Sequence, residues 1–428
     1  MRIVQVIPGS GDNFYCENCV RDGATVRALA AAGHDVVPVP LYLPQVIDPV
    51  EAITASPVFY GGINSYLQQK SGFFRWTPRW IDRLFDSKPL LRMAAKRAGS
   101  VRASGLGELT LSVLQGAEGR QVKELDRLLR WLEKLEKPDV VHLSSPLLLG
   151  IGSAIKRRLG VPLVCTMQDE DVWIDAMEEP ARSRCWESMA AGGRDVDAFI
   201  AVSRHFGDVM RGRLKIQASR LHVVPIGIDP GGPPAGKAPD PPAIGYLARM
   251  SRGMGLGILV DAFFILKKSV PNLRLHLSGG KTGDDVEFLE GLRGRFASGD
   301  VTIFDEFDEA KRREFLSGLT LLSVPTPNGA AFGTYILEAL ACGVPVVQPR
   351  VGSFPELLDA TGGGVLYEPN DAETLARALG ELLADGARRA ELGRRGRDSV
   401  VRSFGLDTMA KNMIEVYRTV LAPAGRRP

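Results

Sequence analysis

One stretch in the last third of the chain, residues 328–345, constrains the fold more than any other. A short apolar run at 319–324 precedes its helical part and another at 344–347 follows it, and each has the composition of a buried strand. Between them, apolar residues at helical spacing predict a helix over about 333–342, which Gly343 ends as a left-handed C′ residue. The order strand, glycine-containing turn, helix, strand predicts one unit of a parallel sheet.

The turn before this helix is a candidate anion site. The first N–H groups of a helix lack intrahelical partners and lie at the positive end of its dipole. Here the backbone of Phe332, Gly333 and Thr334 brings such groups to one end of the predicted sheet, and a single carboxylate, Glu338, lies in the second turn. We therefore expect a negatively charged ligand at this position.

Length and composition bound the remaining possibilities. A chain of 428 residues is too long for one ordinary core and predicts two domains, with three as the alternative. A net charge of +3 gives no basis for nucleic-acid binding. The first apolar run, residues 3–7, is far too short for a signal or a membrane span, so it is expected to be a strand. Five scattered cysteines fit a reducing, cytoplasmic setting.

Predicted strands and helices alternate in both halves of the chain. The strands are expected at 2–7, 36–39, 139–143, 162–166, 198–202, 221–224, 243–247, 273–277, 301–304, 319–324, 344–347 and 364–366. Three helices, at about 371–384, 386–402 and 407–421, close the chain. Residues 230–242 hold six prolines and three glycines and cannot form an element. We therefore expect two doubly wound domains, joined by this linker and facing a cleft.

The loop after the first strand permits several interpretations. Gly9 and Gly11 could begin a dinucleotide fingerprint, but Phe14 occupies the place of the third glycine, so a tight loop is preferred to an NAD site. Cys16 and Cys19 form a C-x-x-C at a helix start, where zinc would need two further ligands. A redox-reactive thiol and a structural role both remain open, and the structural role is preferred.

A basic segment, residues 70–102, interrupts the alternation. Trp76, Trp80 and Leu84 fall one helical turn apart among many lysines and arginines. Such a segment is able to lie on an anionic membrane surface, giving the protein a peripheral location at the inner face. The preferred interpretation is that its aromatic residues pack on their own domain while the basic face meets water. An acceptor groove is a further alternative.

The residues now carry a resemblance to a known family. The run 332–346, Phe-Gly-Thr-Tyr-Ile-Leu-Glu-Ala-Leu-Ala-Cys-Gly-Val-Pro-Val, resembles the signature of the retaining nucleotide-sugar glycosyltransferases of group 1 (family 4), which have the GT-B fold. Weaker pieces come in the family's order at 225–229, 245–249, 352–356 and 362–369.

The resemblance implies an α/β protein with two doubly wound, Rossmann-like domains that face a central cleft, and a C-terminal helix that crosses back to the N-terminal domain. It assigns residues 1–229 to acceptor binding, 230–242 to the linker, 243–405 to the sugar nucleotide, and 406–428 to the returning helix.

The resemblance also implies roles for single residues. Glu338 matches the second glutamate of the family's E-x7-E motif, which accepts hydrogen bonds from the ribose hydroxyls. Arg249 matches the arginine that holds the diphosphate and stabilises the leaving group. The amides at 332–334 match the phosphate-binding helix start. Because a guanidinium and a helix dipole meet the charge, no metal and no cofactor beyond the donor are expected. The loop expected to face the acceptor contains Gly9, Gly11, Asp12 and Asn13.

Three positions depart from the family. Ala330 stands where the family has the glutamate that contacts the donor sugar, and Met254 stands where it usually has a phosphate-binding lysine. Gln168 stands where many members carry a histidine near the reacting carbon; glutamine cannot act as an acid or base, although it can hydrogen-bond a sugar hydroxyl. Each lost charged contact costs ~1.5–3 kcal/mol.

Nearby residues are candidates to compensate. Arg252 or Lys281 could replace the missing cation, and Asn328 could partly replace the missing carboxylate. A separate acidic cluster, Asp169, Glu170 and Asp171, lies just past the end of a predicted strand, where open α/β sheets place ligands.

Three functions remain open at this point. The first is a metal-independent, retaining hexosyl transfer from a nucleotide-diphosphate sugar to a carbohydrate or lipid-linked acceptor. The second is a catalytically silent relative that binds a nucleotide sugar or glycan, as the three departures would favour. The third is another GT-B enzyme such as a sugar-nucleotide epimerase, against which the run 332–346 argues.

Overall fold

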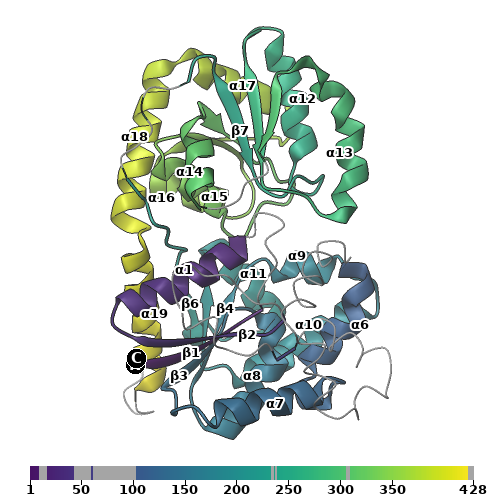
Figure 1. The fold of residues 1–428 in the computed structure, drawn as a ribbon, viewed down its shortest axis with the longest axis vertical. Coiled ribbons are helices and arrows are strands. Elements are labelled where there is room, and N and C mark those ends of the chain that lie inside the picture. Colours follow the sequence, from purple (N-terminus) through teal and green to yellow (C-terminus); the bar gives the residue numbers. More distant parts are fainter. Residues whose placement is uncertain are drawn as a thin grey trace. The chain divides into compact units, whose positions relative to one another are not determined.

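A computed structural model describes residues 1–8, 17–42, 59–60, 103–232, 236, 239–304 and 309–422 (Figure 1). Gly9, Gly11, Asp12, Asn13 and Cys16 lie outside the described residues, as does the whole basic segment 70–102. The predictions made for them therefore stay predictions.

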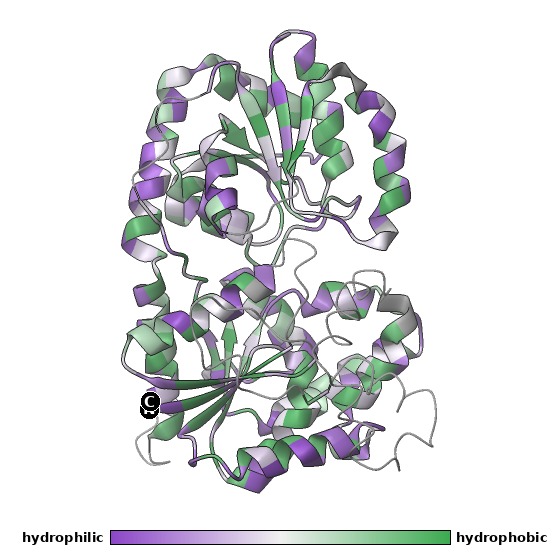
Figure 2. Ribbon diagram, in the orientation of Figure 1, coloured by the Kyte–Doolittle hydropathy of each residue, from purple (hydrophilic) through white to green (hydrophobic). Residues whose placement is uncertain are grey.

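The chain forms two compact units. The first comprises Met1–Gly11, Asn18–Pro225 and Met409–Pro428, and the second comprises Asp12–Glu17 and Ile226–Thr408. Each unit contains a six-stranded sheet whose paired strands are all parallel, with helices on either side (Figure 1). The strands are largely hydrophobic, whereas the helices carry both hydrophobic and hydrophilic residues, as expected for sheets covered on both faces (Figure 2).

The first sheet has the strand order β2-β1-β3-β4-β5-β6. Its strands are β1 (Arg2–Ile7), β2 (Asp35–Pro40), β3 (Val140–Leu143), β4 (Leu163–Met167), β5 (Ala198–Ala201) and β6 (Leu221–Val223). The helices of this unit are α1 (Glu17–Ala31), α6 (Ala103–Leu114), α7 (Val122–Leu132), α8 (Leu149–Leu159), α9 (Glu170–Asp175), α10 (Ala181–Gly192) and α11 (Arg204–Leu214). β3, β4 and β5 are buried at every position, because helices cover them on both sides.

The second sheet has the order β12-β11-β10-β7-β8-β9. Its strands are β7 (Ala243–Leu247), β8 (Arg274–Ser278), β9 (Val301–Phe304), β10 (Leu321–Leu322), β11 (Val346–Pro349) and β12 (Gly364–Tyr367). The helices are α12 (Leu256–Lys267), α13 (Val286–Arg293), α14 (Glu309–Ser317), α15 (Thr334–Ala341), α16 (Phe354–Thr361), α17 (Ala372–Ala384) and α18 (Gly386–Ser403). The two sheets thus have the doubly wound topology that the alternating pattern predicted.

The last helix, α19 (Leu406–Leu421), returns to the first unit from Met409 onward. Its buried Tyr417 meets His142 of β3, whose Nδ1 lies 2.8 Å from the tyrosine hydroxyl, and the other ring nitrogen lies 2.7 Å from Thr166 Oγ1 of β4. The predicted crossing of the C-terminal helix is therefore confirmed, and a buried polar contact fixes it to the sheet.

One expected strand is shorter than predicted. The run 319–324 is buried, but only Leu321–Leu322 forms a strand, paired to β7 and β11. The apolar composition of this run correctly indicated that it is buried, but not how much of it pairs with other strands. After Leu322 the chain leaves the sheet and forms the long loop before α15.

The start of the proline-rich segment is held by Arg313, which donates to the carbonyls of Pro230 and Gly232.

Among the described residues, no helix combines the length and the hydrophobicity needed to cross a membrane.

Candidate active site

The carboxyl edge of the second sheet collects most of the predicted site residues. Loops leave β7 at 248–255, β8 at 279–282, β10 at 323–333 and β11 at 350–353, and these four strands are neighbours. Because parallel strands end at the same edge, these loops meet where doubly wound sheets bind ligands. The residues that lie on them, or at the helix start that follows, are Arg249, Arg252, Met254, Lys281, Asn328, Ala330, Phe332, Gly333 and Thr334.

Glycines set the course of the loop before α15. Gly329, Gly333 and Gly352 have φ angles of +75°, +92° and +60°, which only glycine adopts readily. A Cβ added at Gly329 would stand 2.7 Å from the Cα of Gly352, so the two backbones touch directly. This approach explains why the glycine of the 352–356 piece accompanies the run 332–346.

Ser353 fixes the same loop through hydrogen bonds to its backbone. Its Oγ donates to the carbonyls of Ala330 and Phe332, both at 3.0 Å, and its N–H donates to Ala330 at 3.2 Å. Ala330, the position where the family's glutamate is missing, is thereby fixed through its backbone. The serine was not identified as a site residue from the sequence, because its role depends on partners in another element.

The start of α15 has the features of an anion site. Gly333 is its N-cap in the left-handed conformation, and Thr334 is the first helical residue. The hydroxyl of Thr334 is fully buried and has no hydrogen-bond partner within the described part of the chain. A buried polar atom without a partner costs free energy, and a phosphate oxygen would satisfy it.

Neighbouring residues hold both the backbone and the guanidinium of Arg249 in place. Its carbonyl accepts a hydrogen bond of 2.8 Å from the buried Tyr246 hydroxyl. Its Nε lies 3.6 Å from Oδ2 of Asp285, and that carboxylate also caps Thr282 through two 2.8 Å hydrogen bonds. The arginine side chain remains 44% exposed whereas the aspartate is 7% exposed, so the guanidinium is held at one edge and open to a ligand. Asp285 is a positioning residue that the sequence patterns did not indicate.

Glu338 is also held by a partner that sequence reasoning missed. Nε of Arg312 on α14 lies 3.2 Å from its Oε1, and the two side chains are 9% and 14% exposed. The guanidinium of Arg312 holds the carboxylate in one direction. Such a carboxylate is suited to accept hydrogen bonds from vicinal hydroxyls.

The candidate replacements for the missing cation lie on the neighbouring loops. Arg252 places its guanidinium over the ring of Phe288, 5.2 Å from the centroid. Lys281 is exposed just after β8. The backbone of Met254 is tied to Ser251, whose Oγ accepts its N–H at 3.2 Å. Both cations are therefore present on loops of the carboxyl edge, and neither forms an ion pair with a described carboxylate.

A second polar cluster lies at the carboxyl edge of the first sheet, around Gln168. Its side-chain amide donates to the carbonyl of Ser144 at 3.3 Å, and its backbone N–H donates to Glu170 at 2.6 Å. Arg21 of α1 donates to the same carbonyl at 2.9 Å and to Asp22 at 2.6 Å. All five residues are buried. The predicted Gln168 thus belongs to a network whose other members, Arg21 and Asp22, lie far away in the sequence.

Burial sets the protonation of this cluster. It raises the pKa of Glu170 well above its usual value, against the opposing effects of nearby hydrogen bonds and Arg21. It also raises the pKa of Asp22, although Arg21 acts in the opposite direction. The side-chain oxygen of Gln168 is buried with no partner among the described residues, so it is available to a hydroxyl group. Within those residues no group of histidine, cysteine, aspartate and glutamate has the arrangement of a metal site.

Two known protein families match different parts of this chain. The family described as Glycosyl transferases group 1 matches residues 233–399, and the family described as Glycosyltransferase Family 4 matches residues 111–231. The two matches divide the chain as the two sheets do, and they define the class of protein. This chain belongs to the group 1 and family 4 glycosyltransferases with the GT-B fold. Transfer of a sugar from a nucleotide sugar is the activity that these matches support.

Named relatives agree with this class. A D-inositol 3-phosphate glycosyltransferase from Xylanimonas cellulosilytica is 28% identical over 391 residues, which is 83% of this chain and 91% of that protein. An alpha-maltose-1-phosphate synthase from Mycolicibacterium smegmatis is 31% identical over 251 residues, but the match covers only 53% of this chain and 64% of that protein.

Solved structures share the fold. A sucrose-phosphate synthase from Thermosynechococcus elongatus has a TM-score of 0.70 at 18% identity, covering 98% of this chain and 99% of that one. The Anabaena protein HepE in complex with UDP has a TM-score of 0.66 at 14% identity, covering 98% and 100%. At these identities the likeness concerns architecture alone.

Proposed function

We propose that this chain transfers a hexosyl group from a nucleotide-diphosphate sugar to a hydroxyl acceptor, with retention of anomeric configuration and without a metal. The observation that carries the proposal is the construction of the second sheet's carboxyl edge. There a partly exposed arginine and a glycine-capped helix start follow neighbouring strands, and a fixed carboxylate lies one turn into that helix.

The roles follow from charge. The diphosphate would bind the N–H groups and the Thr334 hydroxyl at the start of α15, in place of the Glu17 carboxylate that accepts the N–H of Thr334 at 2.7 Å, with Arg249 as its counter-charge. As the bond from the sugar to the diphosphate breaks, negative charge grows on the leaving oxygen, and both features stabilise it. Glu338, oriented by Arg312, would accept the ribose hydroxyls. Because these groups supply positive charge themselves, the proposal needs no cation.

The first unit would bind the acceptor. Gln168 offers a buried amide oxygen that accepts a hydroxyl proton in a hydrogen bond, although it cannot take up the proton itself. We propose a carbohydrate or lipid-linked acceptor. A lipid-linked acceptor would agree with peripheral membrane contact through residues 70–102, which sedimentation with anionic liposomes at low salt would detect.

Donor binding is the first test. Calorimetry against a panel of UDP-, GDP- and ADP-sugars in EDTA should find one class that binds. Arg249→Ala and Glu338→Ala should each weaken it by about 10- to 150-fold, because each removes a charged contact worth ~1.5–3 kcal/mol. The matched controls are the exposed Arg388→Ala and Glu381→Ala of the same unit. Unchanged affinity in the first two variants would refute the site.

Turnover is the second test. With the binding donor and an acceptor panel, NMR of the product should show the anomeric configuration of the donor, at a rate that EDTA leaves unchanged. Gln168→Ala should lower kcat/KM for the acceptor while donor affinity stays the same. Inverted product, or loss of activity in EDTA, would contradict the proposal.

A catalytically silent binder is the second candidate function. Ala330, Met254 and Gln168 favour it, because each lacks a group that the family uses. The distinguishing result is donor binding that depends on Arg249 and Glu338 but leads to neither transfer nor slow hydrolysis.

A further inference from the structure

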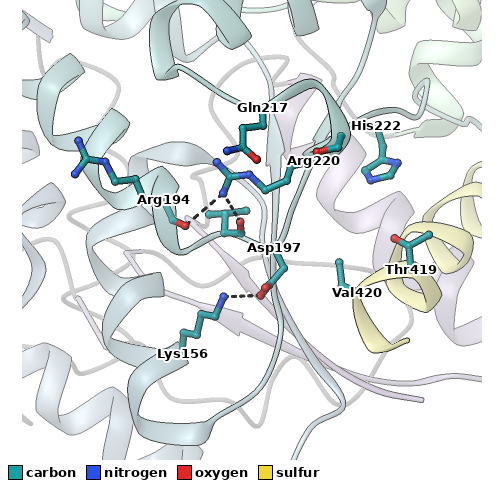
Figure 3. A pocket seen from close by; sticks show the side chains of 10 residues that line it. Lys156, Arg194, Asp197, Gln217, Arg220, His222, Thr419 and Val420 are labelled. Atoms are coloured by element: carbon teal, nitrogen blue, oxygen red, sulfur yellow. Dashed lines mark hydrogen bonds and ion pairs between the residues drawn. The ribbon is translucent and has the colours of Figure 1, made fainter. Parts of the chain in front are cut away.

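A cavity of about 600 Å³ lies at the opposite edge of the first sheet (Figure 3). Asp197 directly precedes β5 and its Oδ2 accepts the N–H of Leu163, the first residue of β4, so this wall stands at the amino ends of the strands. Gln168 follows the carboxyl end of β4. The five residues of β4 separate the two places by roughly 16 Å. The cavity is therefore distinct from the polar cluster around Gln168.

The charges on the cavity wall do not cancel. Asp197, the one carboxylate in the lining, is satisfied by Lys156, whose Nζ lies 2.7 Å from Oδ2, and by the N–H of Leu163 at 2.8 Å. Arg194 and Arg220 also line the cavity, and neither forms an ion pair with any described carboxylate. Within the described part of the chain, Arg194 and Arg220 therefore have no carboxylate as a counter-charge.

Arg220 is rigidly held and still has donors to offer. Its Nη1 donates to the carbonyls of Val196, Gly193 and Arg194 at 2.8, 3.2 and 3.3 Å, which fixes the plane of the guanidinium. Its Nε is buried and has no hydrogen-bond partner among the described residues. Figure 3 shows this side chain between the backbone of Arg194, whose exposed guanidinium points away from it, and His222. A planar cation with a fixed direction loses little freedom when it binds an oxyanion.

Neutral polar groups complete the lining. Gln217, Ser219 and Thr419 contribute an amide and two hydroxyls. Burial lowers the pKa of His222, so its ring is neutral near pH 7 and serves as a donor or an acceptor. The volume falls within the roughly 300–1,000 Å³ of small-molecule sites, which exceeds what a bare ion needs.

We propose that this cavity binds a small, soluble phosphate monoester, with the phosphate on Arg220 and Arg194 and the polar body of the molecule against Gln217, Ser219 and Thr419. Thr419 and Val420 belong to the last turns of α19, so the ligand joins the edge strand β6 to the C-terminal helix. Bound ligand stabilises that end of α19 without entering either carboxyl edge.

The test uses glucose 1-phosphate and inorganic phosphate as probes, with the full chain carrying Arg249→Ala so that the carboxyl edge of the second sheet contributes little. Calorimetry should detect glucose 1-phosphate binding and weaker binding of inorganic phosphate. Arg194→Gln and Arg220→Lys should each weaken it by about tenfold or more, because each removes a charged or bidentate contact. Arg211→Gln, an exposed arginine on α11 of the same unit, is the control and should change nothing.

Hydrogen exchange supplies the second readout. Glucose 1-phosphate should slow exchange in α19 and at β6, and Arg194→Gln should abolish this protection even if Arg220→Lys disturbs folding. No binding by the wild-type cavity, or binding that both arginine variants leave intact, would overturn the proposal. Arg194-dependent sedimentation with phosphatidylglycerol vesicles, without binding of glucose 1-phosphate, would also overturn it in favour of a lipid surface.

Discussion

The carboxyl edges of the two sheets place their charges in opposite ways. In the second unit, Arg249 is 44% exposed and lies at an edge that glycines keep open. In the first unit, Arg21, Asp22 and Glu170 are almost completely buried and bond to one another or to the backbone around Gln168. The same topology thus supports one edge with a partly exposed arginine and another edge whose charged residues are buried beside one another.

The difference bears on which substrate each edge accepts. A diphosphate carries its charge into the site and needs a cation that is not already neutralised. A sugar hydroxyl needs only an oriented acceptor or donor, which a neutral amide supplies. The contrast therefore supports the proposal that the second unit binds the donor and the first unit binds a neutral hydroxyl group.

A methyl group added at Gly329, in the loop before α15, should have the largest effect on donor binding. Gly329→Ala places a methyl group 2.7 Å from the Cα of Gly352 in a backbone conformation that alanine avoids, so the loop before α15 must move. We expect donor binding to be lost in calorimetry and the free energy of unfolding to fall by about 2–4 kcal/mol. Gly299→Ala is the control, since φ is +71° there but nothing lies within 4 Å of the added methyl. Equal effects of the two substitutions would show that strain alone is responsible.

Replacing Arg312, which forms an ion pair with Glu338, should have the second-largest effect on donor affinity. Arg312→Met removes the guanidinium that lies 3.2 Å from the nearly buried Glu338 carboxylate, so this ion pair no longer holds the carboxylate in one direction. The expected loss of donor affinity is about 10- to 100-fold, and Glu338→Ala in the same chain should add little, because the two act together. Lys311→Met on the same helix, with a half-exposed side chain, should be neutral. Additive effects in the double variant would contradict the pairing.

Lowering the pH should reduce the free energy of unfolding of the first unit, because His142 becomes protonated when the unit unfolds. Burial, aided by Arg21, lowers the pKa of this histidine to about 3, so the folded state keeps it neutral while the unfolded state protonates it near pH 6.5. Its contribution is therefore present above pH 6.5 and is lost as the pH falls, by about 2 kcal/mol between pH 7 and pH 5. The raised pKa of Glu170 acts with the opposite sign, so the measurement is the difference in pH slope between wild type and His142→Gln. Identical slopes would rule out a neutral, buried His142.

The smallest effect is expected at Asp285. Asp285→Asn keeps a side-chain oxygen for the Thr282 cap but removes a negative charge beside Arg249. Because Arg249 is largely solvated, the gain in affinity for a diphosphate should be no more than about fivefold. Asp261→Asn, which removes an exposed carboxylate paired to Arg295, should leave affinity unchanged. Weaker binding by Asp285→Asn would show that the carboxylate mainly aims the arginine.

Local signals in the sequence were sufficient to predict most of the fold. Helical periodicity and a terminal glycine predicted α15 and its end, where Gly343 has φ of +76°. Glycine, proline and apolar runs act within a few residues, so they indicate elements without knowledge of the packing. The same logic failed for β10, because residues 319–324 are buried throughout whether or not they pair.

The residues that hold the site residues in place could not be predicted from the sequence. Arg312 meets Glu338, and Ser353 meets the carbonyl of Ala330, only after separate elements have packed together. An arginine or serine on a helix carries no local mark of such a contact. The sequence therefore indicated which residues resemble those of a donor site, whereas the side chains that hold them in place became visible only in three dimensions.

Hydrogen exchange with a nucleoside diphosphate in EDTA reports on both carboxyl edges in one experiment. If the second unit binds the donor, exchange should slow in the peptides that contain residues 248–256 and 325–341 and should not change around residues 163–175 of the first unit. Arg249→Ala should remove that protection. Protection confined to the first unit, or protection that appears only after a divalent metal is added, would contradict the assignment of a metal-free donor site to the carboxyl edge of the second sheet.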